Sequence, residues 1–328
     1  MSKPNPVLGY ARPVILCSSS LRPPYAVGPD RIVRLAAEAG FDGLAVDHAT
    51  PLDLVAPVAT AGLRSGVPVA LGTCPVAASL LPERKRLPHL VARDDPEERL
   101  AACKLARQGL ELGGPLGIRR FVVELGPAAL RTAEVGFRLG FARAEMEQGE
   151  PGTRQLRLAL AERKQVAQQL YDAGRAALEA LLPVAERNDI ELVLPIAAGP
   201  WQVPSPRETL LLLEEFRGAP LGVAFCPARR AVLERLDLSG PKERWPLLAA
   251  ATRVVLATDE VGLDSDLLLG TGELAVSPLE GVPADAALAV SGPPASTIRE
   301  VVRARRRAAR LLTPAQEEAE SAQAKVSP

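Results

Sequence analysis

The stretch VILC at residues 14–17, together with PDRIVRLAAEAGFDGLAVD at residues 29–47, decides the fold of this chain. The first run is apolar and of strand length, and it leads into a polar Cys-Ser-Ser-Ser loop. Apolar residues at helical spacing then predict a helix that Pro29 and Asp30 open and Gly40 ends. Residues 41–46 are a second apolar run of strand length. A strand, a helix and a strand in this order form a βαβ unit.

The same alternation continues through the rest of the chain. Strands are predicted at residues 14–16, 41–46, 67–71, 120–123, 190–194, 221–225, 253–257 and 286–290, and helices at 30–39, 52–63, 95–112, 157–187, 210–216 and 295–312. Eight strands with mostly helical connections predict an α/β fold, a closed parallel (β/α)8 TIM barrel. The alternative is an open doubly wound sheet, which carries a glycine-rich phosphate-binding loop after its first strand. The first strand here has no such loop after it, and this favours the barrel.

The predicted barrel is a single domain of residues 12–312. Residues 127–155, after the fourth strand, are rich in glycine, alanine and charged side chains, and they predict an irregular helical insertion. Residues 313–328 are polar and predict a disordered C-terminal tail.

The composition argues against several classes of function. The 328 residues carry 39 basic and 39 acidic side chains, so no net charge favours nucleic acid or an anionic membrane. No apolar run is long enough to predict a transmembrane helix, and residues 1–13 lack the apolar core of a signal peptide. The 4 cysteines are widely spaced and indicate reduced thiols. We therefore expect a cytoplasmic protein.

Four segments, taken in their order along the chain, carry a resemblance to a known family. They are residues 32–44 (IVRLAAEAGFDGL), 103–123, 181–194 and the loop Gly270-Thr271-Gly272-Glu273. Together they resemble the xylose isomerase-like TIM barrels, which include sugar isomerases and epimerases and the family 2 abasic-site endonucleases. The likeness covers most of residues 12–312. It implies a divalent metal held at the strand ends by carboxylates and histidines.

The positions that the resemblance assigns to metal ligands hold other residue types. The glutamate after the fifth strand falls on Pro195, and the Asp-x-x-His pattern after the sixth falls on Cys226 and Arg229. Further ligand positions fall on Ala45, Glu124, Leu256 and Ser291 and near Asp266, while Asp259 matches an expected aspartate. An arginine fixed beside a divalent ion would repel it by roughly several kcal/mol. We therefore expect a barrel without this metal and without a cofactor; a divalent metal is the alternative.

Several polar side chains are still predicted at the barrel mouth. His48, Glu124 and Asp259 are the candidate catalytic residues, as an acid–base set or a displaced metal site. Ordinary rim residues are the alternative. Cys17, Cys74 and Cys226 follow strands one, three and six and could bind zinc with His48, but no ligand spacing supports this, and buried cysteines are common core residues.

Five residues are candidates for ligand binding. Arg229 and Arg230 open the helix after the sixth strand, where a phosphate or carboxylate is favoured. Trp201, after the fifth strand, could stack on a ligand. Asp47 and Cys226 complete the set. Surface exposure of the arginines and loop packing of the tryptophan are the alternatives.

The last predicted helix is amphipathic. Arg303, Arg306, Arg307 and Arg310 lie on one face, and the opposite face carries Ile298, Val301, Val302, Ala308, Ala309 and Leu312. The basic face could bind an acidic protein partner, or be a solvated outer face of the barrel. The lack of interleaved aromatic residues disfavours nucleic acid.

These observations predict a barrel that has lost most metal ligands of the family it resembles. Its expected role is to bind a small polar or anionic molecule or a protein partner, without catalysis or without metal. The alternative is an active sugar isomerase or epimerase with a rearranged site at the mouth.

Overall fold

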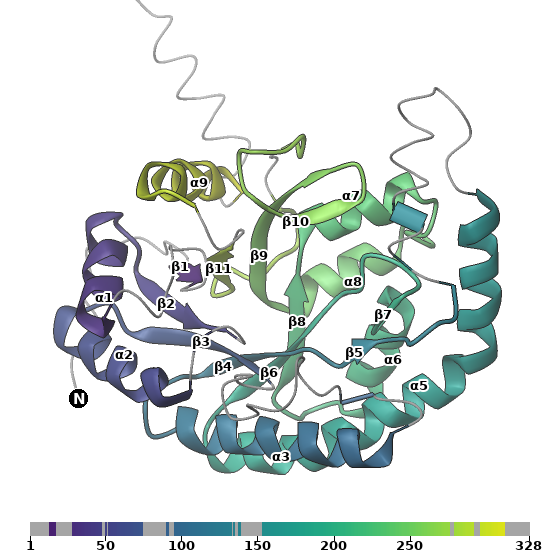
Figure 1. Ribbon diagram of the computed structural model, residues 1–328, viewed down its shortest axis with the longest axis horizontal. Coiled ribbons are helices and arrows are strands. Elements are labelled where there is room, and N and C mark those ends of the chain that lie inside the picture. Colours follow the sequence, from purple (N-terminus) through teal and green to yellow (C-terminus); the bar gives the residue numbers. More distant parts are fainter. Residues whose placement is uncertain are drawn as a thin grey trace, which may run out of the picture.

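Eight parallel strands close into a barrel in the described part of the chain, and helices surround them (Figure 1). The structure is a computed structural model of the full chain. It describes residues 13–17, 28–47, 50, 52–74, 90–91, 95–132, 134, 137–138, 153–275, 279–291 and 296–311. The prediction of an α/β TIM barrel is confirmed. The predicted tail at residues 313–328 and most of the predicted insertion at 127–155 lie outside the described residues.

The barrel strands are neighbours in chain order, and the last strand pairs with the first. They are β1 (Val14–Cys17), β2 (Gly43–Val46), β3 (Val69–Cys74), β4 (Arg120–Val123), β6 (Glu191–Pro195), β8 (Leu221–Phe225), β9 (Thr252–Val261) and β11 (Ala287–Val290). Each pairs in parallel with the next, and Ile15 lies opposite Ala289 where β1 and β11 close the ring. All strand C-terminal ends therefore lie at one end of the barrel, which we call the mouth.

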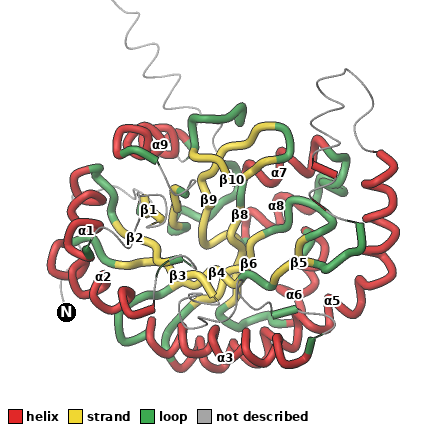
Figure 2. The backbone as a smooth tube through the Cα atoms, in the orientation of Figure 1, coloured by secondary structure: helices red, strands yellow, loops and turns green. Residues whose placement is uncertain are grey.

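The described helices form the outer ring of the molecule, as Figure 2 shows. They are α1 (Pro29–Glu38), α2 (Leu52–Ser65), α3 (Pro96–Gly113), α5 (Thr153–Arg187), α6 (Pro206–Glu215), α7 (Pro227–Arg235), α8 (Arg244–Ala250) and α9 (Ile298–Arg310). Side chains cap the N-termini of α3 and α6. The Asp95 side chain accepts from the Glu98 N–H, and Ser205 and Glu208 form a capping box. None of the described helices combines the length and apolarity needed to cross a membrane.

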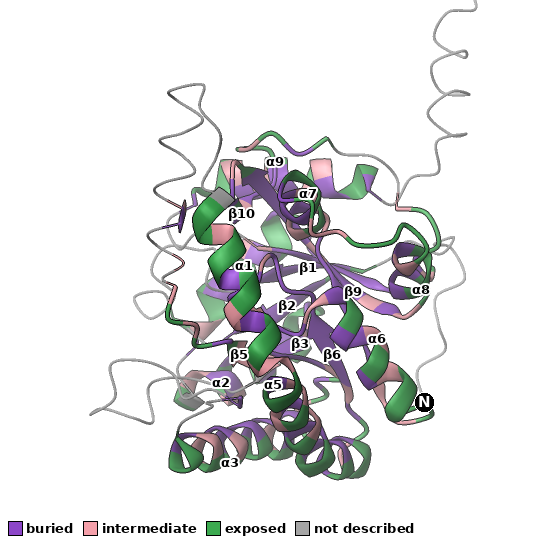
Figure 3. Cartoon of the chain, turned by 90° about the vertical axis from the view of Figure 1, so that its right-hand side faces the viewer, coloured by how far each residue is buried: buried purple, intermediate pink, exposed green. Residues whose placement is uncertain are grey.

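Burial separates two apolar layers. Inside the barrel lies a small cluster of Ile15, Leu71, Val122, Val193 and Val254 together with Cys17 and four alanines. A larger core lies between the strands and the helices. Figure 3 shows buried strands at the centre and exposed outer faces on the helices. The interior is therefore a packed core, as in other TIM barrels.

Phe121 occupies a slot between two glycines on different elements. A Cβ at Gly72 on β3 would lie 2.3 Å from the Phe121 ring, and a Cβ at Gly113 on α3 would lie 2.5 Å from it. Both distances are far below van der Waals contact. The absence of side chains at these two positions thus makes room for the ring between β3 and α3.

Three charged side chains lie at the N-terminal end of the barrel. Glu191 accepts from Arg120 Nε at 3.1 Å and from Arg253 Nε at 2.8 Å. Gly222 leaves room for Arg253, because a Cβ there would lie 2.6 Å from its Cγ. One carboxylate thus joins β4, β6 and β9.

The structure contains elements that the sequence did not predict. β9 continues beyond the predicted strand at 253–257 and turns at Gly262 into an antiparallel partner, β10 (Asp264–Leu268). The short strands β5 (Gly126–Pro127) and β7 (Gln202–Val203) pair outside the barrel. Helix α8 is also additional.

Candidate functional site

The mouth is the natural place for a site in this fold, because the loops after all the barrel strands meet there. Asp47, Glu124 and Ser291 directly follow β2, β4 and β11, Cys226 directly follows β8, and Pro195 is the last residue of β6. Each position agrees with the predicted strand ends. Ala45 belongs to the cluster inside the barrel and Leu256 packs against it, so both lie below the mouth.

Cys226 is a neutral thiol held by a hydrogen-bond chain. Its Sγ lies 3.2 Å from Thr258 Oγ1, and the Thr258 hydroxyl donates to the Ser265 carbonyl at 2.6 Å. Because that hydroxyl has only one proton, the Cys226 S–H must donate to Thr258. Burial raises the pKa of Cys226, although the Arg229 charge and the Thr258 hydroxyl partly oppose it. A thiol in this state is a poor metal ligand.

Arg229 lies on the first turn of α7, and its side chain is 16% exposed. Its Nη1 donates to the Ile196 carbonyl at 3.4 Å and its Nη2 to Asp266 Oδ1 at 3.5 Å. Both contacts are long for charge-assisted hydrogen bonds, which are typically about 2.7–2.9 Å. Burial lowers the pKa of Arg229, but Asp266, Cys226 and Glu124 together raise it above its usual value. A permanent, weakly paired cation therefore lies above the ends of β6 and β8.

Asp259 is fully buried and organises the loop after β10. Its carboxylate accepts backbone hydrogen bonds from Glu260 at 2.9 Å, Gly270 at 2.7 Å and Leu274 at 2.8 Å. Burial raises the pKa of Asp259, but these backbone donors outweigh it and lower the pKa overall. A Cβ at Gly272 would lie 2.7 Å from Oδ1, so the loop wraps closely around the carboxylate. This geometry favours a structural role; the catalytic role stays a prediction.

On the opposite side of the barrel from Arg229, Cys17 belongs to the cluster inside the barrel, and Asp47 lies near it at the end of β2. Burial and the negative charge of Asp47 raise the pKa of Cys17, and a hydrogen bond with Ser291 lowers it. The net result is a pKa of about 12. Asp47 caps its own turn, because Thr50 Oγ1 donates to its Oδ1 at 3.4 Å and accepts from its N–H at 3.2 Å. These groups offer a protonated thiol, a hydroxyl and a carboxylate.

The two described members of the predicted acid–base set, Glu124 and Asp259, do not come together in the structure. Glu124 is exposed after β4, while Asp259 is enclosed by its own loop. His48 lies outside the described residues, as does the side chain of Cys74.

Trp201 and Arg230 do not face the mouth. Trp201 is buried, its Nε1 donates to the Thr132 carbonyl at 2.7 Å, and its ring lies 4.8 Å from that of Phe137. Arg230 pairs with Glu234 at 2.8 Å and stacks over Trp245 at 5.0 Å. Arg229 and Arg230 therefore have different partners, and Trp201 packs among loop residues; a ligand-binding role for Trp201 and Arg230 stays a prediction.

The basic face of α9 differs in part from its prediction. Arg303, Arg306 and Arg310 are exposed, whereas Arg307 is half-buried beside Gly270. Val301, Ala304 and Ala308 form the buried face, and Ala309 is exposed. The face is available to solvent, and an acidic partner for it stays a prediction.

The described residues at the strand ends do not fit a hard divalent metal. Such an ion needs several oxygen or imidazole donors. Among the residues that the structure describes, no three histidine, cysteine, aspartate or glutamate side chains lie close enough together to hold one. At three positions where the resemblance implies metal ligands, the chain has a proline ring, a neutral thiol and a guanidinium (Pro195, Cys226 and Arg229).

The sequence did not predict the partners of Arg229 and Cys226. Asp266 and Thr258 come from the β9–β10 hairpin, which reaches α7 beside the mouth (Figure 1). Arg235 strengthens this contact, because it binds Glu260 at 2.6 Å and also donates to the Gly262 carbonyl. A local signal that could have revealed the hairpin is Gly262, because glycine favours tight turns between strands.

Solved structures share this fold over nearly the whole chain. A 3-keto-D-glucoside 4-epimerase from E. coli is 16% identical with a TM-score of 0.62, and covers 92% of this chain and 99% of its own. An L-ribulose 3-epimerase is 13% identical with a TM-score of 0.59, covering 97% and 100%. A xylose isomerase domain protein from Planctomyces limnophilus is 13% identical with a TM-score of 0.54, covering 89% and 94%.

No protein-family model and no curated protein matches the sequence. The chain thus shares the TIM-barrel fold of these solved structures, and identities this low show the fold alone.

Proposed function

We propose that this barrel works without a metal and binds a small anionic, hydroxyl-rich molecule at its mouth, of the class of sugar phosphates or sugar acids. The observation that carries the proposal is Arg229. Its guanidinium is largely buried and always charged, and its contacts at 3.4 and 3.5 Å leave most of its donor capacity for a ligand.

Other groups at the strand ends suit the same ligand. The hydroxyl of Ser291, which directly follows β11, can exchange hydrogen bonds with hydroxyl groups of a ligand. Asp266, the acidic partner of Arg229, is mostly exposed, so a ligand anion can replace it at little cost. The structural neighbours named above are sugar epimerases and a xylose isomerase domain protein, and this supports a sugar-like body for the ligand.

Metal-independence rests on the residues at the strand ends. An Arg229 cation in the site opposes a second cation, and Pro195 offers no side-chain donor. Elemental analysis of protein purified without chelator tests this point. About one equivalent of Mn, Zn, Mg or Co per chain, lost in His48→Ala, would overturn it.

A thermal-shift titration tests the ligand class. We expect ribose 5-phosphate or gluconate to raise the melting temperature by roughly 4 °C at a hundredfold excess over Kd, and neutral ribose to have no effect. Arg229→Gln should abolish the shift. Arg230→Gln is the matched control, because it removes the same charge from the adjacent position, which faces away from the mouth. An equal shift in both variants, or none in the wild type, contradicts the proposal.

The competing function is a sugar isomerase or epimerase that uses His48, Glu124 and Asp259. It is tested by solvent-deuterium incorporation into ketoses, followed by NMR. Incorporation that is lost in Glu124→Gln would replace the binding proposal with catalysis.

A further inference from the structure

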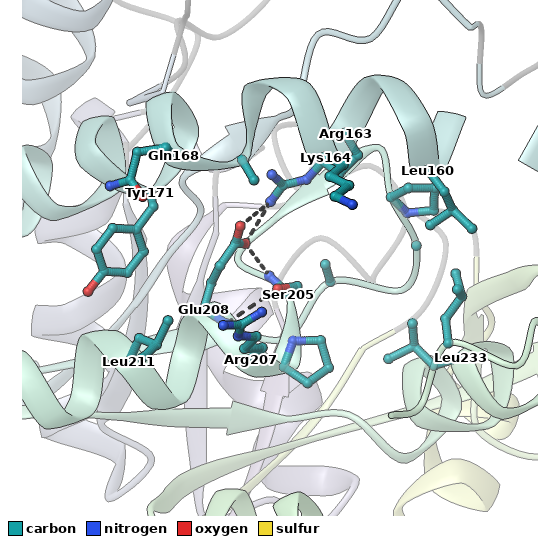
Figure 4. A pocket seen from close by; sticks show the side chains of 16 residues that line it. Leu160, Arg163, Lys164, Gln168, Tyr171, Ser205, Arg207, Glu208, Leu211 and Leu233 are labelled. Atoms are coloured by element: carbon teal, nitrogen blue, oxygen red, sulfur yellow. Dashed lines mark hydrogen bonds and ion pairs between the residues drawn. The ribbon is translucent and has the colours of Figure 1, made fainter. Parts of the chain in front are cut away.

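A cavity lies outside the barrel, between α5 and α6 and beside the last turn of α7 (Figure 4). Its volume is about 570 Å³, within the usual range for sites that enclose small molecules. None of the mouth residues lines it. The cavity is therefore independent of the site proposed above.

One part of the cavity wall is apolar. Leu160 on α5 and Leu211 on α6 line it, and they are 36% and 46% exposed. Leu233 at the end of α7 and Leu238 beyond it add to this wall. Figure 4 shows Leu160 and Leu233 at one side of the opening and Tyr171 with Leu211 at the other. A ligand that covers these leucines removes apolar surface from water, which favours binding.

An ion pair without net charge, formed by Arg163 and Glu208, also lines the cavity. Arg163 Nη2 donates to both carboxylate oxygens of Glu208 at 2.6 Å, and both side chains are nearly buried. Glu208 also accepts from the Ser205 N–H in the capping box. Arg163 Nη1 is buried and has no acceptor among the described residues. Glu208 is thus fully engaged, while the guanidinium retains an unused donor.

Two further cations line the cavity and have no acidic partner in the described part of the chain. Lys164 follows Arg163 on α5, and Arg207 precedes Glu208 on α6. Because Arg163 already neutralises Glu208, the only carboxylate among the described lining residues, the charges of Lys164 and Arg207 remain uncompensated. The cavity therefore combines an apolar wall with a local excess of positive charge.

We propose that this cavity binds a small amphipathic carboxylate, with one acid group on an apolar body. The acid group lies between Lys164 and Arg207, and the apolar body covers Leu160, Leu211 and Leu233. A strongly polar ligand would leave the leucines unused, and a cationic one would meet two like charges.

Isothermal titration with three probes tests this inference. We expect octanoate to bind, while acetate, which lacks the apolar body, and octylammonium, which reverses the charge, do not bind in the same concentration range. The double variant Lys164→Gln/Arg207→Gln should weaken octanoate binding by at least about tenfold. Leu211→Glu should abolish it, because it places a like charge in the apolar wall.

Matched controls separate the cavity from general surface effects. Arg303→Gln removes an exposed cation from α9, and Leu247→Glu changes an exposed leucine on α8; both should bind octanoate as the wild type does. Arg229→Gln should also leave it unchanged, so the mouth and the cavity are judged separately. Equal binding of octylammonium, or wild-type octanoate affinity in the double variant, overturns the inference.

Discussion

At the N-terminal end of the barrel, Glu191 binds Arg120 at 3.1 Å and Arg253 at 2.8 Å, whereas at the mouth Arg229 reaches its two acceptors only at 3.4 and 3.5 Å. The first end holds two arginines around one central acid. The second holds a single arginine whose acid, Asp266, lies largely in solvent. The comparison distinguishes the ion pairs of Glu191, which stabilise the barrel, from the charge of Arg229, which is available to bind a ligand.

Stability and binding are thus placed at opposite ends, as is usual in this architecture. The N-terminal network joins three strands that are far apart in sequence. The mouth instead depends on the β9–β10 hairpin, which is held to α7 by Arg235 and to its own loop by Asp259. The following predictions test this division, beginning with the largest expected effect.

Asp259 is the exception at the mouth, because its hydrogen bonds are short and complete. Asp259→Asn should lower the free energy of unfolding by about 3 kcal/mol, since an amide nitrogen then faces backbone donors. The lowered pKa of Asp259 gives this contribution a pH window. It is fully present above the unfolded value of about 3.9, and it is lost as the pH falls through the lower folded pKa.

Urea denaturation between pH 2 and pH 7 measures both effects. The variant should lose less stability on acidification than the wild type, because it lacks this titrating group. Identical acid profiles would show that Asp259 does not organise the loop.

Glu191→Gln should lower the free energy of unfolding by about 2 kcal/mol, because it leaves Arg120 and Arg253 without their shared charge. Glu234→Gln is the control, since it removes the acid of an exposed pair on α7 and should cost at most about 0.5 kcal/mol. Chemical denaturation measures both. Equal losses would show that the N-terminal network is no different from a surface ion pair.

Much of the barrel could be predicted from the sequence, because its strands are apolar on both faces. The run at 286–290, for example, matches β11 (Ala287–Val290) closely. The hairpin was missed because Thr258, Asp259 and Glu260 look like loop residues, although hydrogen bonds with α7 and with the following loop let them be buried. Polarity alone cannot distinguish a solvated residue from one whose partners come from a distant turn.

The candidate site was predicted less well than the fold. Residues 229 and 230 are separated by about 100° around a helix, so only one of them can face the mouth; this could have been foreseen. The partner of Trp201 could not, because its indole donates to Thr132, which is far away in sequence. Long-range contacts of this kind have no local signal.

Cys17 should make the protein less stable in alkaline solution. Its folded pKa of about 12 lies above the unfolded value, so the folded state keeps a proton that the unfolded state releases. This contribution is complete below about pH 8.5 and declines by about 1.4 kcal/mol per pH unit above it, up to the folded pKa. Denaturation at pH 8 and pH 10 measures the decline, and Cys17→Ser should reduce it. A decline of the same size in that variant would assign it to other groups.

Arg229→Gln should have the smallest effect, within about 0.5 kcal/mol of the wild type, because its contacts are long and its partner is exposed. Differential scanning calorimetry without ligand measures this change. A loss as large as that of Glu191→Gln would show that Arg229 is a structural ion pair like those at the other end.

The slot around Phe121 restricts how this sequence can change. The Phe121 ring fills the space beside Gly72 and Gly113. A side chain at either glycine is therefore compatible with the fold only if a smaller residue replaces Phe121. A smaller residue at position 121 would in turn leave a void until one of the glycines gains a side chain. Neutral drift at these three positions therefore has to pass through a less stable intermediate. In a set of related sequences, they should vary together and not singly.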